Sequence, residues 1–154
     1  KKHISKTKEL LGNKKLGMKI VIPVDVKVGA SLESRKAIWR TIDEVKADEY
    51  ILDIGPRTRR FYTQLVRHAG SVIWNGPLGL FENKHFRSGT RAIVRACANA
   101  RGVGIIIGGG DTLSAVGRQR LSRKRNVFLS TGGGAMLAFL AGEELPGLEP
   151  LIEL

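Results

Sequence analysis

Residues 105–116 read IIIGGGDTLSAV, an apolar run followed by three glycines, an aspartate, a threonine and a helix-like pattern. The apolar run predicts a buried strand, and the residues from Asp111 onward predict a helix. Because glycine costs conformational entropy, a plain turn between these elements would need one or two glycines rather than three. We therefore interpret the glycines as a segment whose bare backbone amides come close to a ligand.

The same order of apolar run, loop and helix extends in both directions along the chain. Strands are predicted over 19–26, 50–55, 71–76, 103–109 and 127–131. Helices are predicted over 56–70, 86–102, 111–121 and 134–142, and a further helix ends at Gly12. Residues 28–45 lack a clean period and predict a loop with a short strand. Apolar strands that alternate with amphipathic helices indicate an α/β fold with a mainly parallel sheet.

The composition is that of one globular domain over residues 1–154, with a net charge of +12. The positive charge has two interpretations, a solvated basic surface or attraction to phosphate groups. Lysine and arginine concentrate in residues 1–19 and in RQRLSRKR at 118–125. Aromatic residues make up 6% of the chain and do not alternate with these clusters. Nucleic acid is therefore not the expected partner, although a basic nucleic-acid-binding module stays as the alternative function.

The sequence also bears on the cellular compartment. No apolar stretch approaches the roughly 20 residues that cross a bilayer, so no membrane partner is expected. The start, KKHISKTKELLG, has no hydrophobic core of a secretion signal. Cys97 is the only cysteine, which excludes an internal disulfide and fits a cytoplasmic protein. Its helical spacing within RAIVRACANA predicts a buried, unreactive thiol.

Ligands in parallel α/β sheets bind beyond the carboxyl ends of the strands, and here these ends are rich in glycine. Two of them, GGGDT at 108–112 and TGGGA at 131–135, run directly into helices. A helix start presents free amides and a partial positive charge, so each segment suits a phosphate group. Neither segment matches the GxxxxGK[ST] or GxGxxG patterns of other nucleotide sites.

Two carboxylates lie near these glycines, and each has two interpretations. Asp111 is a hard oxygen donor at a helix start, which suits Mg²⁺ on a nucleotide, but aspartate is equally a common helix N-cap. Glu82 in WNGPLGLFEN could accept hydrogen bonds from ribose hydroxyls or could be a solvated loop residue. No Ser/His/Asp or Cys/His arrangement for covalent catalysis is present in the sequence.

Taken together, the motifs resemble the phosphoglycerate kinase family. They are PVDV, LDIGP, WNGPLGLFE, IIGGGDT, and STGGGA followed by ELPGLEPL, in the family's order and over nearly the whole chain. The interval of 21 residues between Asp111 and Gly132 (132 − 111) also matches without a gap. The resemblance implies a three-layer Rossmann-like parallel sheet with helices on both faces, forming part of the nucleotide-binding domain of a two-domain kinase.

The resemblance further implies a reaction and a set of contacts. The family transfers a phosphoryl group reversibly between 1,3-bisphosphoglycerate and MgADP, giving 3-phosphoglycerate and ATP. By motif, Glu82 would hold the ribose, and Asp111 would hold Mg²⁺. The nucleotide phosphates would contact Gly109, Gly110, Asp111 and Thr112, with Asn75 nearby. The adenine slot would be lined by Leu52, Pro77 and Leu80. The amides of Gly110 and Gly134 would donate to the phosphoryl group while it is being transferred.

The chain is less than half the length of family members, and this limits what the resemblance implies. Phosphoglycerate would bind through an N-terminal domain that these residues do not include, and the first strands of the nucleotide domain are also outside them. We therefore expect a monomeric fragment that is inactive by itself. A structural remnant with a degraded site is the third alternative, and the presence of Glu82, Asp111, Gly110 and Gly134 argues against it.

Overall fold

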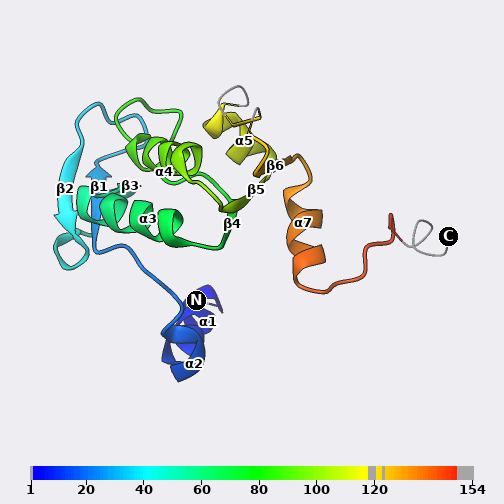
Figure 1. Ribbon diagram of the computed structural model, residues 1–154. Helices are drawn as coiled ribbons and strands as arrows, with labels where there is room; N and C mark the ends of the chain where they lie inside the picture. The colour runs from blue at the N-terminus through cyan, green and yellow to red at the C-terminus, as the bar shows by residue number, and fades with distance from the viewer. Residues whose placement is uncertain (1, 118–120, 123, 149–154) are drawn as a thin grey trace.

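The computed structural model describes residues 2–117, 121, 122 and 124–148 (Figure 1). Its centre is a parallel sheet of three strands in the order β4-β5-β6. These strands are β4 (Ser71–Asn75), β5 (Gly104–Gly108) and β6 (Val127–Ser130). The register pairs Asn75 with Gly108 and Gly108 with Ser130, so the three carboxyl ends lie side by side. The predicted strands at 71–76, 103–109 and 127–131 are confirmed.

Helices cover both faces of this sheet. On one face lie α3 (Pro56–His68), α4 (Ser88–Asn99) and α5 (Gly110–Val116), and α7 (Gly133–Leu140) lies on the other (Figure 1). The main core forms between the sheet and the first group of helices, where Ile107, Cys97 and Leu113 are almost fully buried. The α/β class with helices on both faces is therefore confirmed.

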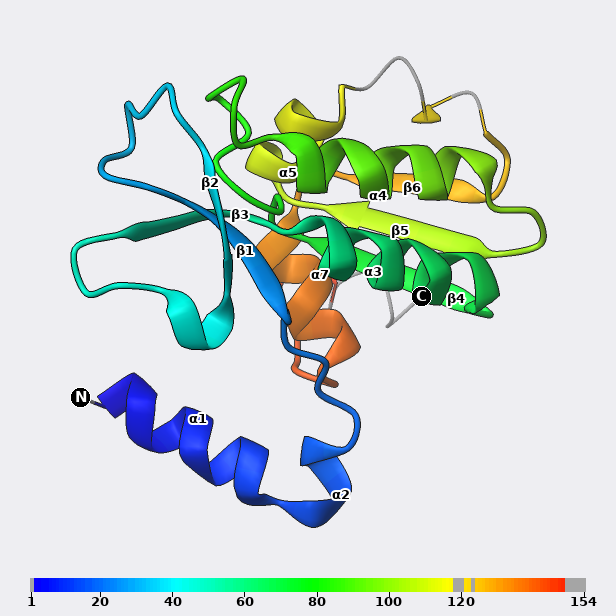
Figure 2. The ribbon, with the colours of Figure 1, turned by 90° about the vertical axis from the view of Figure 1, so that its left-hand side faces the viewer.

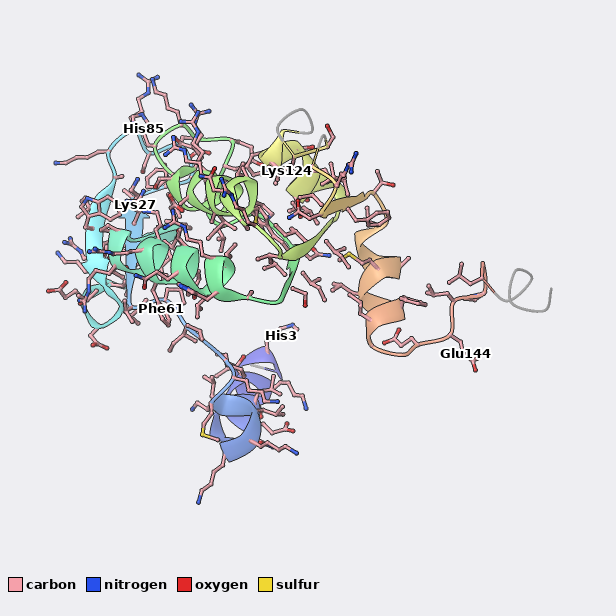
Figure 3. All side chains as sticks on the ribbon, in the orientation of Figure 1. His3, Lys27, Phe61, His85, Lys124 and Glu144 are labelled. Carbon is pink, nitrogen blue, oxygen red and sulfur yellow. The ribbon has the colours of Figure 1, made fainter. Side chains whose placement is uncertain are left out.

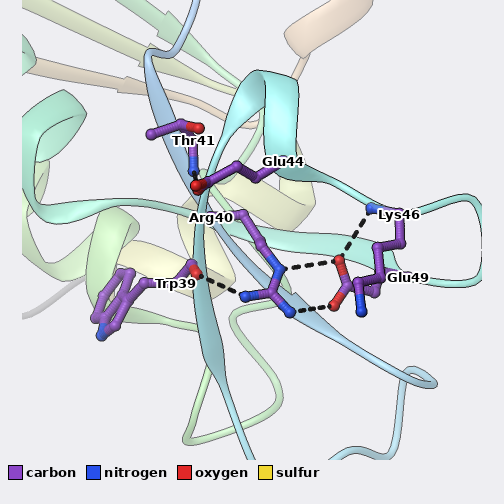
Figure 4. Close-up of polar contacts among 6 residues, drawn as sticks. All are labelled: Trp39, Arg40, Thr41, Glu44, Lys46 and Glu49. Carbon is purple, nitrogen blue, oxygen red and sulfur yellow. Dashed lines mark hydrogen bonds and ion pairs between the residues drawn. The ribbon is translucent and has the colours of Figure 1, made fainter.

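A second sheet of three antiparallel strands lies beside the first one, in the order β2-β1-β3. Its strands are β1 (Asp25–Gly29), β2 (Ile38–Thr41) and β3 (Tyr50–Ile54). The ambiguous segment 28–45 thus contains the end of β1, all of β2 and a short 3-10 helix, η1 (Ile42–Glu44). Arg40 of β2 forms an ion pair with Glu49 at 3.0 Å, which ties β2 to the loop before β3 (Figure 4).

The prediction of a buried strand over 19–26 is wrong for most of that range. Residues 20–24 are outside any strand, and Ile22 and Val24 are 58% and 50% exposed. At Val24 the reason is that the backbone amide donates to the hydroxyl of Thr58, at 3.0 Å, instead of to a neighbouring strand. The strand begins only at Asp25.

The helices at the start of the chain lie outside both sheets (Figures 1 and 2). Helix α1 (Lys2–Gly12) ends at the predicted glycine. The side chain of Asn13 then caps α2 (Lys14–Gly17) by accepting from the amides of Lys15 and Leu16. Among the described residues, no helix is long and apolar enough to cross a bilayer.

The structure confirms the buried cysteine and shortens the helix that was predicted over 111–121. Cys97 is fully buried, and this burial raises the pKa of its thiol to about 11, as expected of an unreactive cysteine. The helix predicted over 111–121 begins at Gly110 and ends at Val116, and residues 118–120 lie outside the described residues. The basic cluster 118–125 and the end of ELPGLEPL fall partly outside them as well.

Candidate functional site

The two glycine clusters meet at the carboxyl ends of β5 and β6. A Cβ added to Gly133 would lie 2.6 Å from the Cα atom of Gly109 and 2.8 Å from its nitrogen, so the two backbones are in direct contact. Gly109 has a φ of +97°, a conformation that side chains with a Cβ rarely adopt. These two glycines are therefore required by packing and by backbone geometry.

The neighbouring glycines Gly110 and Gly134 have a different environment. Both are exposed, and a Cβ added to either would have nothing within 4 Å. They occupy the first turns of α5 and α7, where backbone amides have no partner within the helix. The contact of Gly109 with Gly133 thus places two helix starts next to each other, each with an open glycine that leaves space for a ligand.

A third segment, the loop after β4, is bonded to both clusters. The side-chain amide of Asn75 donates to the carbonyl of Gly133 at 3.4 Å, and the backbone amide of Gly76 donates to the hydroxyl of Thr112 at 2.8 Å. Thr112 is 1% exposed, and its hydroxyl is engaged in this bond. Asn75 is exposed and lies between the clusters.

Asp111 is exposed in the first turn of α5, but it does not cap the helix. The N-cap position belongs to Gly109, so the capping interpretation of Asp111 is wrong. Among the described residues, no cluster of three or more histidine, cysteine, aspartate or glutamate side chains could hold a metal ion. A single exposed carboxylate beside two helix starts could contribute one ligand to a Mg²⁺ ion whose other ligands come from a bound molecule.

The loop 76–86 brings the remaining candidate residues together. The backbone amide of Leu80 donates to the carbonyl of Leu52 at 2.7 Å, so these two residues of the predicted adenine slot are neighbours. Leu52 is 5% exposed, whereas Leu80 and Pro77 are half-buried. Glu82 follows two residues later and is exposed to solvent. The structure thus places an apolar surface and a free carboxylate in the same loop region.

Comparison with known proteins shows the family to which this arrangement belongs. A family model described as phosphoglycerate kinase matches residues 1–143. The chain belongs to the phosphoglycerate kinase family. Phosphoglycerate kinases from two strains of Francisella tularensis subsp. tularensis are 40% identical over 153 residues, covering 97% of this chain and 38% of the relative.

Solved phosphoglycerate kinases share the fold. The structure from Coxiella burnetii is 42% identical with a TM-score of 0.75, and the match covers 84% of this chain and 34% of that one. The structure from Pyrococcus horikoshii OT3 is 28% identical with a TM-score of 0.76, covering 96% and 35%. The chain thus spans about 38% of the length of the curated relatives that it matches.

Two buried carboxylates of this phosphoglycerate kinase chain had no predicted role. Asp25 accepts from the amide and hydroxyl of Thr58, at 2.7 and 2.6 Å, and from the amide of Arg57 at 2.9 Å. Burial alone would raise the pKa of Asp25, but the hydrogen bonds from Thr58 and Arg57 outweigh it and lower the pKa. Asp25 therefore remains ionised, and from the start of β1 it caps the start of α3.

The side chain of Asp53 caps the start of α4. Its carboxylate accepts from the amide and hydroxyl of Ser88, at 2.9 and 2.6 Å, and from the amide of Gly89 at 3.0 Å. An aspartate within an apolar strand signals such a role, because a buried charge needs hydrogen-bond donors. The motifs PVDV and LDIGP carry this signal, but they do not show which helix supplies the donors.

Proposed function

We propose that these 154 residues form the nucleotide-binding part of a phosphoglycerate kinase and constitute a single domain of it. The observation that carries the proposal is the contact between Gly109 and Gly133, which sets the starts of α5 and α7 side by side. The reaction is the reversible transfer of a phosphoryl group between 1,3-bisphosphoglycerate and MgADP, with 3-phosphoglycerate and ATP as products. This is the step of glycolysis from which the family takes its name.

In this proposal the nucleotide phosphates lie against the first turn of α5. Gly109, Gly110 and Thr112 contact them, with the amide of Gly110 free to donate, and Asn75 contacts them from the neighbouring strand. Asp111 holds Mg²⁺, which neutralises charge on the phosphates when it is bound. The exposure of Asp111 and the open space at Gly110 support this placement.

The rest of the nucleotide extends toward the loop 76–86. Adenine lies against Leu52, Pro77 and Leu80, where apolar surface favours a flat aromatic base. Glu82 accepts hydrogen bonds from the ribose hydroxyls. The bond between Leu80 and Leu52 supports this assignment, because it holds the two sides of the slot together.

Transfer itself requires positioning and charge stabilisation more than proton transfer. The amides of Gly110 and Gly134 are the groups that this chain offers to the equatorial oxygens of the phosphoryl group. Neither amide must move or change its protonation state, so both can act in either direction of the reaction. The nucleophile is an oxygen of ADP or of a carboxylate, both already ionised, and no general base is needed.

The substrate and setting also belong to this proposal. Phosphoglycerate, or 1,3-bisphosphoglycerate, binds through the part of the enzyme outside the matched region, which is more than half of the relatives' length. We propose a monomer that works in the cytoplasm with MgADP and MgATP as nucleotide partners. The high pKa of Cys97 supports a thiol that takes no part in the reaction.

Replacement of Asp111 by asparagine should weaken MgADP binding by about tenfold or more, because an amide is a poorer ligand for Mg²⁺ than a carboxylate. Calorimetric titration at physiological salt measures this. The matched control is Asp48→Asn, which removes an exposed carboxylate from a turn outside the site. ADP without Mg²⁺ should bind both variants equally, and an unchanged affinity of Asp111→Asn for MgADP would contradict the proposal.

These 154 residues alone should not convert 1,3-bisphosphoglycerate at a rate typical of enzymes, because part of the charge stabilisation of the transition state lies outside them. A coupled assay of ATP formation measures this, with a full-length phosphoglycerate kinase as the positive control. Turnover by the isolated chain at about 1 s⁻¹ or faster would show the prediction to be wrong.

A further inference from the structure

Helices α3 and α4 pack side by side and enclose a groove of about 580 Å³ on their outer surface. Five arginines line it from both helices. We call it the arginine groove, and these residues are Arg59, Arg60 and Arg67 of α3 and Arg91 and Arg95 of α4. It shares no residue with the proposed nucleotide site. Figure 3 shows the nitrogen-ended side chains that project from this pair of helices.

The positive charge of the groove is not balanced by its own helices. Neither α3 nor α4 contains an acidic residue. The ion pairs found among the described residues, Lys6–Glu9 and Arg40–Glu49, involve none of the groove arginines. Asp25 and Asp53 already occupy the starts of the two helices, so the attraction for anions comes from the guanidinium groups. Arg87, just before α4, has a buried Nε atom that lacks a hydrogen-bond partner within the described part of the chain.

The shape of the groove favours a long anion over a single phosphate. It extends along α3 from Pro56 to Arg67, which is about 17 Å at the rise of an α-helix. Its arginines are distributed along both walls and not gathered at one point. This distribution suits successive phosphates of an extended chain, and guanidinium groups bind phosphate oxygens in pairs.

An exposed tryptophan lies beside one of these arginines. Trp39 of β2 is 46% exposed, and its ring lies 5.6 Å from the guanidinium of Arg59 and 4.6 Å from the ammonium of Lys27. Figure 4 shows its ring on the opposite side from the Arg40–Glu49 pair. Aromatic side chains next to cationic grooves stack the bases of single-stranded nucleic acids.

We propose that the arginine groove, with Trp39 beside it, binds single-stranded nucleic acid. The arginines hold successive backbone phosphates, and Trp39 stacks on a base at one end. Contacts between these arginines and backbone phosphates carry no sequence information, so binding does not depend on sequence. Nucleic acid was not the partner expected from the sequence, in which Trp39 lies 20 positions before Arg59 (59 − 39), and only the fold brings the two together.

The test measures the anisotropy of a fluorescein-labelled oligothymidylate of about 12 nucleotides, titrated with the intact chain at several salt concentrations. The variant Arg60→Gln/Arg91→Gln/Arg95→Gln should bind about tenfold more weakly or worse. Its slope of log affinity against log salt should be shallower by about 2, from three lost phosphate contacts. Trp39→Ala should weaken binding by about fivefold or more.

Matched control variants distinguish binding in the arginine groove from general attraction of the oligonucleotide to a positively charged chain. Lys14→Gln/Lys15→Gln/Lys19→Gln removes the same charge from exposed positions at or next to α2, and Phe128→Ala removes an exposed aromatic ring from β6. Both should change the affinity by less than about twofold. Equal losses in the two triple variants would overturn the proposal, and so would an unchanged affinity in Trp39→Ala. Displacement of the oligonucleotide by MgADP would overturn it without any variant, because the two ligands would then share one site.

Discussion

Gly133→Ala should destabilise the chain by about 3 kcal/mol, because its new methyl group would collide with backbone and not with a movable side chain. The added Cβ would lie 2.6 and 2.8 Å from the Cα and nitrogen atoms of Gly109. Gly109 cannot easily withdraw, since its amide is bonded to the carbonyl of Ser130 at 3.1 Å. Urea unfolding at neutral pH measures the change in the free energy of unfolding.

Gly134→Ala is the matched control, because it adds the same methyl group one residue later in the same helix. Nothing lies within 4 Å of that position, and alanine favours the helix, so stability should be unchanged or up to about 1 kcal/mol higher. Gly110→Ala should also fold normally, and both exposed variants should bind MgADP more weakly because the methyl group occupies ligand space. If Gly133→Ala proved as stable as the parent chain, the contact of the two backbones would not be needed for the fold.

The difference between Gly133 and Gly134 shows where the sequence stops being informative about this site. Two glycine clusters at neighbouring strand ends predicted a phosphate site, and the strands and helices that carry them are as expected. However, the letters GGG do not distinguish a glycine that packs against another backbone from one that faces solvent. That distinction depends on the pairing of β5 with β6, which sets the distance between the clusters.

Long-range contacts explain the other differences between prediction and structure. An apolar run such as 19–26 indicates burial but does not identify the partner, and here the hydroxyl of Thr58 accepts from the amide of Val24 in place of a neighbouring strand. Arg91 and Arg95 of α4 are four residues apart, and Arg60 and Arg67 of α3 are seven apart, so each pair forms a basic stripe on one face of its helix. Only the packing of the two helices against each other turns these stripes into one groove.

Asp25→Ala should cost about 3 kcal/mol of stability, because it leaves buried donors at the start of α3 without a partner. The carboxylate accepts three hydrogen bonds from Arg57 and Thr58 and fills the space beside Gly55, so alanine would also leave a void. Asp25→Asn keeps the shape and should cost less, about 1 to 2 kcal/mol. Asp48→Ala, at an exposed turn, should be neutral.

The pH dependence of this loss distinguishes the charge of Asp25 from its shape. Its pKa in the folded chain lies below the ordinary value of 3.8, so its ionised form is favoured by folding. The unfolded chain therefore takes up a proton first as the pH falls, and the stabilisation is complete above 3.8 and disappears as the pH drops through the folded pKa. The difference in unfolding free energy between the parent chain and Asp25→Asn should be constant near neutral pH and shrink in acid. A difference that stays the same throughout the acid range would mean that the cap acts through shape alone, and the ionised carboxylate would have no part in holding α3.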